Sequence, residues 1–173
     1  MTPQLRKLLQ IDHVLTARIA GRPLRTGVRW VATLITYTGD SIAWLVLGAL
    51  LWRFGIGVWA RIGERVLFAT ALTWVVSTSL KSFLQRPGPE HTEGLFCLEI
   101  DRHSLPSAYA TRAGGLLVAA GSLLPAWGAA ALAVWALSLG LSRVALRLHY
   151  VGDVVSGMLL GGLTGALLLF VLR

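Results

Sequence analysis

Long apolar stretches make up most of this chain, and their lengths limit what it can fold into. The last of them, residues 151–171, contains a single charged side chain. The others span residues 28–52, 62–84, 107–124 and 126–146. A helix needs about 20 apolar residues to cross the hydrocarbon core of a bilayer. The sequence therefore predicts a multi-pass integral protein of the cell membrane.

The composition favours the same class of protein. Of the 173 residues, 55% are hydrophobic and 14% are charged, and the mean hydropathy is +0.67. Soluble domains contain about 45–50% apolar residues even when glycine is counted. The net charge of +8 then indicates contact with anionic membrane lipids. No polar module remains for nucleic acid, so we expect a single membrane-embedded domain, residues 1–173, that binds none.

Two segments have a less regular pattern. Residues 1–22 mix apolar and charged side chains, and residues 3–20 are predicted to form an amphipathic helix on the membrane surface. Residues 28–52 are either one span or two helices that meet at Gly39-Asp40. Asp40 is accordingly either a functional acid inside the membrane or a helix N-cap. The predicted fold is an all-α bundle of five to six helices.

The segment from Ser142 to Asp153 concentrates charged side chains at the end of an apolar stretch. Arg143 and Arg147 are four residues apart and share a helix face. Either an anion between them relieves their repulsion, or both extend to lipid headgroups. His149 and Asp153 have the same spacing, so the carboxylate can accept a hydrogen bond from one ring nitrogen. The other nitrogen is then unprotonated and nucleophilic.

Further groups that favour phosphate lie at the ends of other apolar stretches. Lys81 and Arg86 lie at the end of residues 62–84, and Pro106-Ser107 begins the next helix. A helix N-terminus attracts anions. If each stretch crosses the membrane once, these groups lie on the same side as His149, and together they indicate phosphoryl chemistry without a metal. A recognisable zinc spacing is absent from His91, Cys97 and His103.

These residues resemble the motifs of the phosphatidic acid phosphatase type 2 superfamily, which also contains bacterial acid phosphatases and vanadium haloperoxidases. The family motifs are K-x6-R-P, P-S-G-H and S-R-x5-H-x3-D. The third is complete here as Ser142-Arg143, His149 and Asp153, and the similarity extends over residues 72–160. The resemblance implies a haloperoxidase-like helical bundle with no metal cofactor.

The resemblance also implies roles for individual side chains. Lys81, Ser107 and Arg143 would hold the phosphate. His149 would attack phosphorus and form a phosphohistidine, and Asp153 would orient His149. The substrate would be a lipid phosphate or diphosphate.

Two positions depart from the family pattern. The arginine of the first motif would fall on Gly88, and Arg86, two residues earlier, can take over its phosphate contact. The second motif reads Pro106-Ser107-Ala108-Tyr109, so Tyr109 stands where the family has the histidine that protonates the leaving oxygen. A general acid contributes about 10²–10⁴ in rate. Tyrosine, with an unperturbed pKa of about 10, is a poor donor near neutral pH.

Two functions of different classes follow from these residues. The first is a membrane phosphatase or phosphotransferase, because the nucleophile His149 and its orienting acid are both present. The second is a family member that binds or carries an anionic lipid without hydrolysing it, which Gly88 and Tyr109 favour. Asp40 gives weaker support to a transporter.

The last apolar stretch also contains a row of glycines at every fourth position. The row consists of Gly157, Gly161 and Gly165. Small residues at this spacing let two helices approach closely in a membrane. We expect the row to be a packing seam, either inside the bundle or between the two chains of a homodimer.

Overall fold

The computed structural model describes residues 3–21, 23–89 and 103–172. This part of the chain is all-α, as the sequence predicts, and forms seven α-helices and one short 3-10 turn at Gly121–Leu123. The helices are α1 (Pro3–Ala20), α2 (Thr26–Tyr37), α3 (Ser41–Phe54), α4 (Val58–Leu84), α5 (Ala108–Ala119), α6 (Ala126–Ala145) and α7 (Val151–Val171). The apolar stretch 28–52 is broken into two helices, so α2 to α7 are six, the upper end of the predicted five to six, and α1 is the amphipathic helix beside them.

The break between α2 and α3 has a clear physical cause. The Asp40 carboxylate accepts hydrogen bonds from the backbone N–H groups of Ile42, at 2.8 Å, and Ala43, at 3.4 Å. Asp40 is therefore an N-cap, as one of the two interpretations held. The buried guanidinium of Arg112 donates to the Gly39 carbonyl and to the Ser41 hydroxyl. Arg112 thus supports the helix break.

Three helices are long and apolar enough to cross a membrane: α4, α6 and α7. The pair α2 and α3, bent by 48° at the break, becomes a fourth if it forms one span. These counts refer to the described ranges of the chain. They agree with the multi-pass membrane protein that the apolar stretches predict.

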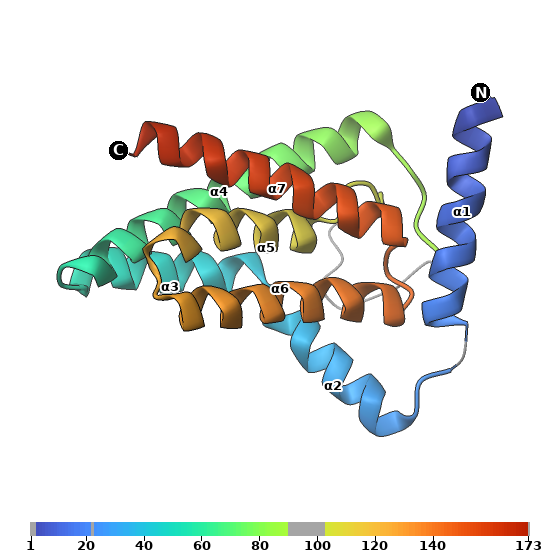
Figure 1. Cartoon of the computed structure of the whole chain (residues 1–173), viewed down its shortest axis with the longest axis horizontal. Coiled ribbons are helices and arrows are strands. Elements are labelled where there is room, and N and C mark those ends of the chain that lie inside the picture. The colour runs from blue at the N-terminus through green and yellow to red at the C-terminus, as the bar shows by residue number, and fades with distance from the viewer. Residues whose placement is uncertain (1–2, 22, 90–102, 173) are drawn as a thin grey trace.

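The helix α5 differs from its prediction as the span 107–124. It has 12 residues and is therefore about 18 Å long, which is too short for the hydrocarbon core. Most of its residues are buried, and it contacts α4, α6 and α7. Figure 1 shows it inside the bundle. A helix rich in alanine and glycine can be enclosed in this way because its neighbours approach its backbone closely.

The glycine row of α7 faces α5 of the same chain. A Cβ atom at Gly157 would lie 2.7 Å from the Ser107 carbonyl oxygen, and one at Gly165 would lie 2.7 Å from the Gly115 carbonyl oxygen. A Cβ at Gly161 would overlap the Thr111 carbonyl. The row is a packing seam inside the bundle, which was the first of the two predicted uses.

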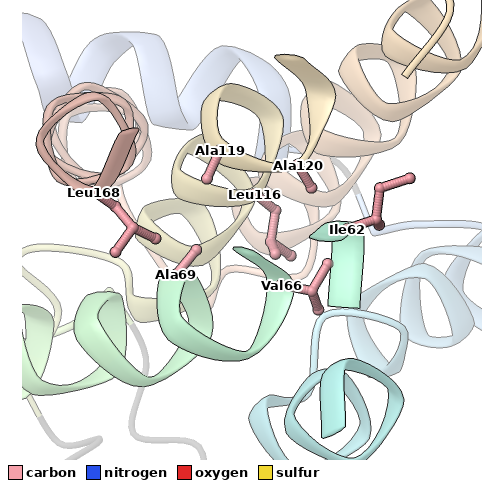
Figure 2. Packing of buried hydrophobic residues seen from close by; sticks show 7 residues of the cluster. All are labelled: Ile62, Val66, Ala69, Leu116, Ala119, Ala120 and Leu168. Atoms are coloured by element: carbon pink, nitrogen blue, oxygen red, sulfur yellow. The ribbon is translucent and has the colours of Figure 1, made fainter. Parts of the chain in front are cut away.

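A cluster of buried apolar side chains holds α4, α5 and α7 together at the end of the bundle where α4 begins and where α5 and α7 end. Figure 2 shows these side chains pointing toward one another. They are Ile62, Val66, Ala69, Leu116, Ala119, Ala120 and Leu168. Each belongs to the first half of α4, to the second half of α5 and the residue after it, or to the end of α7. The cluster and the glycine seam together fix α5 along its whole length.

Adjacent glycines of α7 provide a test of the seam. We expect Gly161→Ala to destabilise the protein by about 1–3 kcal/mol, the usual cost of overpacking. The matched control is Gly162→Ala, whose Cβ would be 3.8 Å from the nearest atom, a Val118 methyl group. Thermal unfolding in detergent measures both. Equal midpoints for the two variants would contradict the close approach of α5 and α7.

Candidate active site

One end of the bundle gathers the residues that the sequence selects. Figure 1 shows that α4 and α6 end there, that α5 and α7 begin there, and that α1 crosses the same end. The order of the elements explains this, because the consecutive helices α4, α5, α6 and α7 run in alternating directions. The selected residues at this end are Lys81, Arg86, Ser107, Tyr109, Arg143, His149 and Asp153.

His149 lies in the turn between α6 and α7 and is 3% exposed. Its Nδ1 is 3.0 Å from the Ser104 carbonyl oxygen. A carbonyl only accepts hydrogen bonds, so Nδ1 carries the proton and Nε2 keeps its lone pair. Nε2 lies 3.1 Å from Nη2 of Arg143, which donates to it. The imidazole is therefore neutral, and the lone pair of Nε2, which accepts from Arg143 in this structure, becomes a nucleophile when that hydrogen bond is exchanged for a contact with phosphorus.

The hydrogen bond that orients His149 differs from the expected one. The nearest Asp153 oxygen, Oδ2, lies 3.7 Å from Nδ1, beyond the range of a hydrogen bond. The Ser104 carbonyl accepts the hydrogen bond from Nδ1–H that was expected to go to Asp153. The carboxylate is still close enough to attract a positive charge on the ring.

Burial lowers the pKa of His149 to about 4, and the positive charges of Arg143 and Lys81 act in the same direction. The interaction with Asp153 opposes these effects but is smaller than the effect of burial. The imidazole is therefore neutral near pH 7. This is the protonation state that a nitrogen nucleophile requires.

The fully buried side chain of Asp153 joins the turn to its surroundings. Its Oδ2 accepts from the backbone N–H of Tyr150 at 2.9 Å, which caps α7. Its Oδ1 accepts from Arg86 Nη1 at 2.8 Å. Its backbone carbonyl accepts from the Ser107 N–H at 3.0 Å. Asp153 thus fixes the start of α7 and the start of α5 relative to each other.

Arg86 was expected to contact phosphate, but in this structure its guanidinium is bonded to carboxylates. Nη1 donates to Asp153, and Nη2 donates to Asp12 of α1 at 2.7 Å. The guanidinium also lies over the Tyr150 ring, 4.3 Å from its centroid. Arg86 therefore lies on the side of His149 where the carboxylates of Asp153 and Asp12 are, and it holds these two side chains in place.

The start of α5 has the features of an anion site. Ser107 is the N-cap residue and is completely buried. Its hydroxyl neither caps the helix nor has a hydrogen-bond partner among the residues that the structure describes. The first N–H groups of any helix also lack partners within the helix. The hydroxyl and these amides can donate together to a phosphate.

Two cations lie near this helix start. Lys81 is in the last turn of α4 and is 1% exposed, and Arg143 is in the last turn of α6. Both are close enough to His149 to lower its pKa. A phosphate oxygen held by them would lie near Nε2 of His149. The structure thus brings Lys81 and Arg143 close to the imidazole, and it bonds the backbone of Ser107 to that of Asp153 in the turn of helix α7 that follows His149.

Tyr109 supports Arg143 with its aromatic ring. The Arg143 guanidinium carbon lies 4.1 Å from the ring centroid, and that of Arg112 lies 5.4 Å from it. The ring also packs against the buried cluster that contains Leu139. These guanidinium–ring contacts are cation–π interactions, which fix the position of a guanidinium by electrostatic attraction. The family position of Tyr109 predicts a role for its hydroxyl, whereas these contacts are made by its ring.

Several other residues of interest lie elsewhere. Arg147, expected either to bind an anion or to reach headgroups, donates from Nε to the Ala20 carbonyl at 3.0 Å. No group of three metal-ligating side chains is present in the described ranges of the chain. Some polar residues of the loop after Pro89 lie outside the described residues: Glu90, His91, Glu93, Cys97, Glu99 and Asp101.

Three contributors to the site could not be predicted from the sequence: Asp12, Thr16 and the carbonyl of Ser104. Asp12 and Thr16 are one helical turn apart in α1, and both are buried. Their spacing indicates a shared face, but not what that face contacts. A backbone carbonyl such as that of Ser104 leaves no mark in the sequence at all.

The protonation of His149 can be measured directly. We expect its imidazole to titrate at about pH 4, because burial disfavours the charged form. Histidine-labelled protein in detergent allows the measurement by ¹⁵N NMR, with His149→Gln assigning the signal. Arg143→Gln should raise the midpoint, since it removes a positive charge beside the ring. A midpoint at the ordinary value of about 6.5 in the unmodified protein would contradict the buried, neutral imidazole.

The chain is similar to known membrane phosphatases. The chain is 29% identical over 159 residues to a protein named lipid A 1-phosphatase from Rhizobium johnstonii. The match covers 78% of this chain and 64% of the relative, so the chain spans less than two thirds of that protein.

Two crystal structures share the fold. LpxE of Aquifex aeolicus has a TM-score of 0.76 at 23% identity, and the match covers 92% of this chain and 95% of LpxE. A PAP2 type phosphatidylglycerolphosphate phosphatase of Bacillus subtilis has a TM-score of 0.75 at 22% identity, with coverages of 95% and 86%. The family model of the PAP2 superfamily matches residues 64–172, which include the whole candidate site except α1. The chain belongs to the PAP2 superfamily.

Proposed function

We propose that this protein is a membrane phosphatase or phosphotransferase that acts on a lipid phosphate or diphosphate through a phosphohistidine at His149. The observation that carries the proposal is the neutral imidazole, whose Nε2 lies at the end of the bundle that holds the cations and the Ser107 hydroxyl. The names of the relatives support it, since the curated relative is a lipid A 1-phosphatase. The position of the site at one end of the membrane spans suits a lipid headgroup.

The first step is the transfer of the phosphoryl group to the protein. Nε2 of His149 attacks phosphorus, and the bond to the leaving oxygen breaks with its electron pair. Lys81, Ser107 and Arg143 hold the phosphoryl oxygens and stabilise their negative charge. The ring becomes positively charged as the P–N bond forms. Nδ1–H stays bonded to the Ser104 carbonyl, and Asp153, at 3.7 Å, attracts the developing charge.

The second step regenerates the protein. Water attacks the phosphohistidine, the P–N bond breaks, and inorganic phosphate leaves. An acceptor alcohol in place of water would give a phosphotransferase by the same chemistry. The electron pair of the P–N bond returns to Nε2, and the protons of the water leave with the phosphate. The imidazole, with its proton still on Nδ1, is then neutral again.

The leaving group decides how much acid catalysis is needed. Tyr109 occupies the family position of the proton donor, but the contacts of its ring favour a role in holding Arg143. A diphosphate needs little protonation because its leaving phosphate is a weak base. A phosphate monoester releases a strongly basic alkoxide and depends much more on an acid. We therefore propose that diphosphates are hydrolysed faster than monophosphates.

The nucleophile is tested with His149→Ala. We expect phosphate release from ³²P-labelled prenyl diphosphate and phosphatidic acid to fall by at least about 10³-fold, since removal of a nucleophile costs that much or more. Labelled protein, trapped under alkaline conditions that preserve phosphohistidine, should disappear as well. The control is Glu64→Gln at the opposite end of the bundle. Hydrolysis that persists in His149→Ala would exclude the mechanism.

The same experiment separates the proposal from the alternative. A protein that only binds or carries an anionic lipid would show lipid binding that inorganic phosphate weakens, with no phosphate release and no labelled histidine. The departure at Tyr109 is the observation that favours this alternative. The neutral, oriented histidine favours hydrolysis.

The role of Tyr109 is tested with two variants. Tyr109→Phe keeps the ring beneath Arg143 and should change diphosphate hydrolysis by no more than a few-fold. Tyr109→His restores the family's proton donor and should raise monophosphate hydrolysis relative to diphosphate hydrolysis. Initial rates of phosphate release from the two lipids measure both effects. A loss of about 10²–10⁴ in Tyr109→Phe, the contribution of a general acid, would instead assign the proton to the hydroxyl.

A further inference from the structure

The helix α1 has two different faces. Its outer face exposes apolar side chains such as Ile11 and Val14, which fits the predicted amphipathic helix on the membrane surface. Its inner face carries Asp12 and Thr16, which are 9% and 6% exposed. This inner face contacts α7, and Figure 1 shows α1 crossing the end of the bundle where α7 begins.

The inner face of α1 caps the N-terminus of α7. The Val151 N–H donates to the Thr16 hydroxyl at 3.1 Å, and the Gly152 N–H donates to Asp12 Oδ1 at 2.7 Å. These amides have no partner within α7 because they lie in its first turn. A cap supplied by another helix is informative here, because this turn directly follows His149. The position of α1 is therefore coupled to the position of the nucleophile.

Asp12 also shares Arg86 with Asp153. Its Oδ2 accepts from Arg86 Nη2 at 2.7 Å, while Nη1 of the same guanidinium donates to Asp153 at 2.8 Å. Gly152 permits this arrangement, since a Cβ there would lie 2.9 Å from Asp12 Oδ2. The three side chains form one ionic network, in which the side chain of Asp153 is fully buried and those of Arg86 and Asp12 are 16% and 11% exposed. A charged group in such a network is held in place strongly, because leaving one partner unpaired is costly.

We propose that Asp12 is a positioning residue for phosphoryl transfer, which fixes the His149–Asp153 turn from α1 through Arg86 and the Gly152 amide. This inference rests on the proposed function. Asp12 lies on the carboxylate side of the imidazole and does not contact the phosphoryl group. Lys81 and Arg143 belong to α4 and α6, so phosphate binding does not depend on Asp12. The network therefore affects the rate of transfer and not the affinity for phosphate.

The rate of phosphohistidine formation tests this role. Asp12→Asn removes the charge that pairs with Arg86 but keeps an oxygen for the Gly152 amide, whereas Asp12→Ala removes both. We expect kcat and the single-turnover rate to fall by about 10- to 100-fold, the loss that a misplacement of about 1 Å causes. Asp12→Ala should be the slower variant. KM, inhibition by inorganic phosphate and the final amount of phosphohistidine should stay unchanged.

The control is Glu64→Gln, which makes the same change of charge at the opposite end of the bundle. A transfer rate in Asp12→Asn equal to that of the control would overturn the proposal. A transfer rate equal to that of the control, combined with a smaller final amount of phosphohistidine, would also overturn the proposal. That result would mean only that less of the Asp12→Asn protein is folded.

A second measurement separates this proposal from the proposed function. If the unmodified protein releases no phosphate from either lipid, the proposed function fails. Hydrogen exchange then tests the contact itself: the amides of Val151 and Gly152 should exchange faster in Asp12→Ala than in the unmodified protein and in Glu64→Gln. Equal exchange in all three would show that Asp12 does not hold the start of α7.

Discussion

The close approach of α5 and α7 is the contact on which the site depends. Glycines on α7 let its backbone reach the backbone of α5, so no side chains separate the two helices. At the end of this seam the Ser107 N–H donates to the Asp153 carbonyl. The hydroxyl that is available for phosphate and the turn that carries His149 are thereby placed side by side. A larger residue at Gly157 or Gly161 would move one of them away from the other.

The site also requires that its charged side chains be stable although they are buried. A carboxylate without a partner is very costly to bury, and a paired one is less so. Arg86 meets this requirement for Asp12 and Asp153 together. At His149, burial instead keeps the side chain uncharged. The Asp153 carboxylate lies beyond hydrogen-bond range of the ring, and burial lowers the pKa of the imidazole, so the ring stays neutral. One environment thus keeps the acids paired and the nucleophile unprotonated.

The two departures from the family motifs involve side chains that contact other charged groups. Arg86, two residues before the family position, is bonded to carboxylates on the α1 side of the histidine. Tyr109, in the place of the family histidine, lies beneath the guanidinium of Arg143. Each residue thus helps to hold a group that the proposed reaction needs. The α1 helix takes part in these contacts through Asp12.

Much of the site followed from local spacing. His149 and Asp153 are one turn apart, so their proximity could be predicted from the sequence. Ser107 directly follows a proline, so its position at the start of a helix could be predicted as well. The predicted hydrogen bond between His149 and Asp153 was replaced by one to the Ser104 carbonyl, because a nearby backbone acceptor is closer. The span predicted for residues 107–124 was wrong, since buried and lipid-facing helices have the same apolar composition.

By itself the sequence determined that this is a membrane protein with a histidine, an acid and several cations at the ends of its spans. Lengths of apolar stretches and spacings within one helical turn contain that information. Only the tertiary structure decided that Asp12 meets Arg86, which lies 74 residues further along the chain. The same holds for the contact between Tyr109 and Arg143 from different helices. Contacts of this kind depend on how helices pack, and the periodicity of a single helix does not specify its partner.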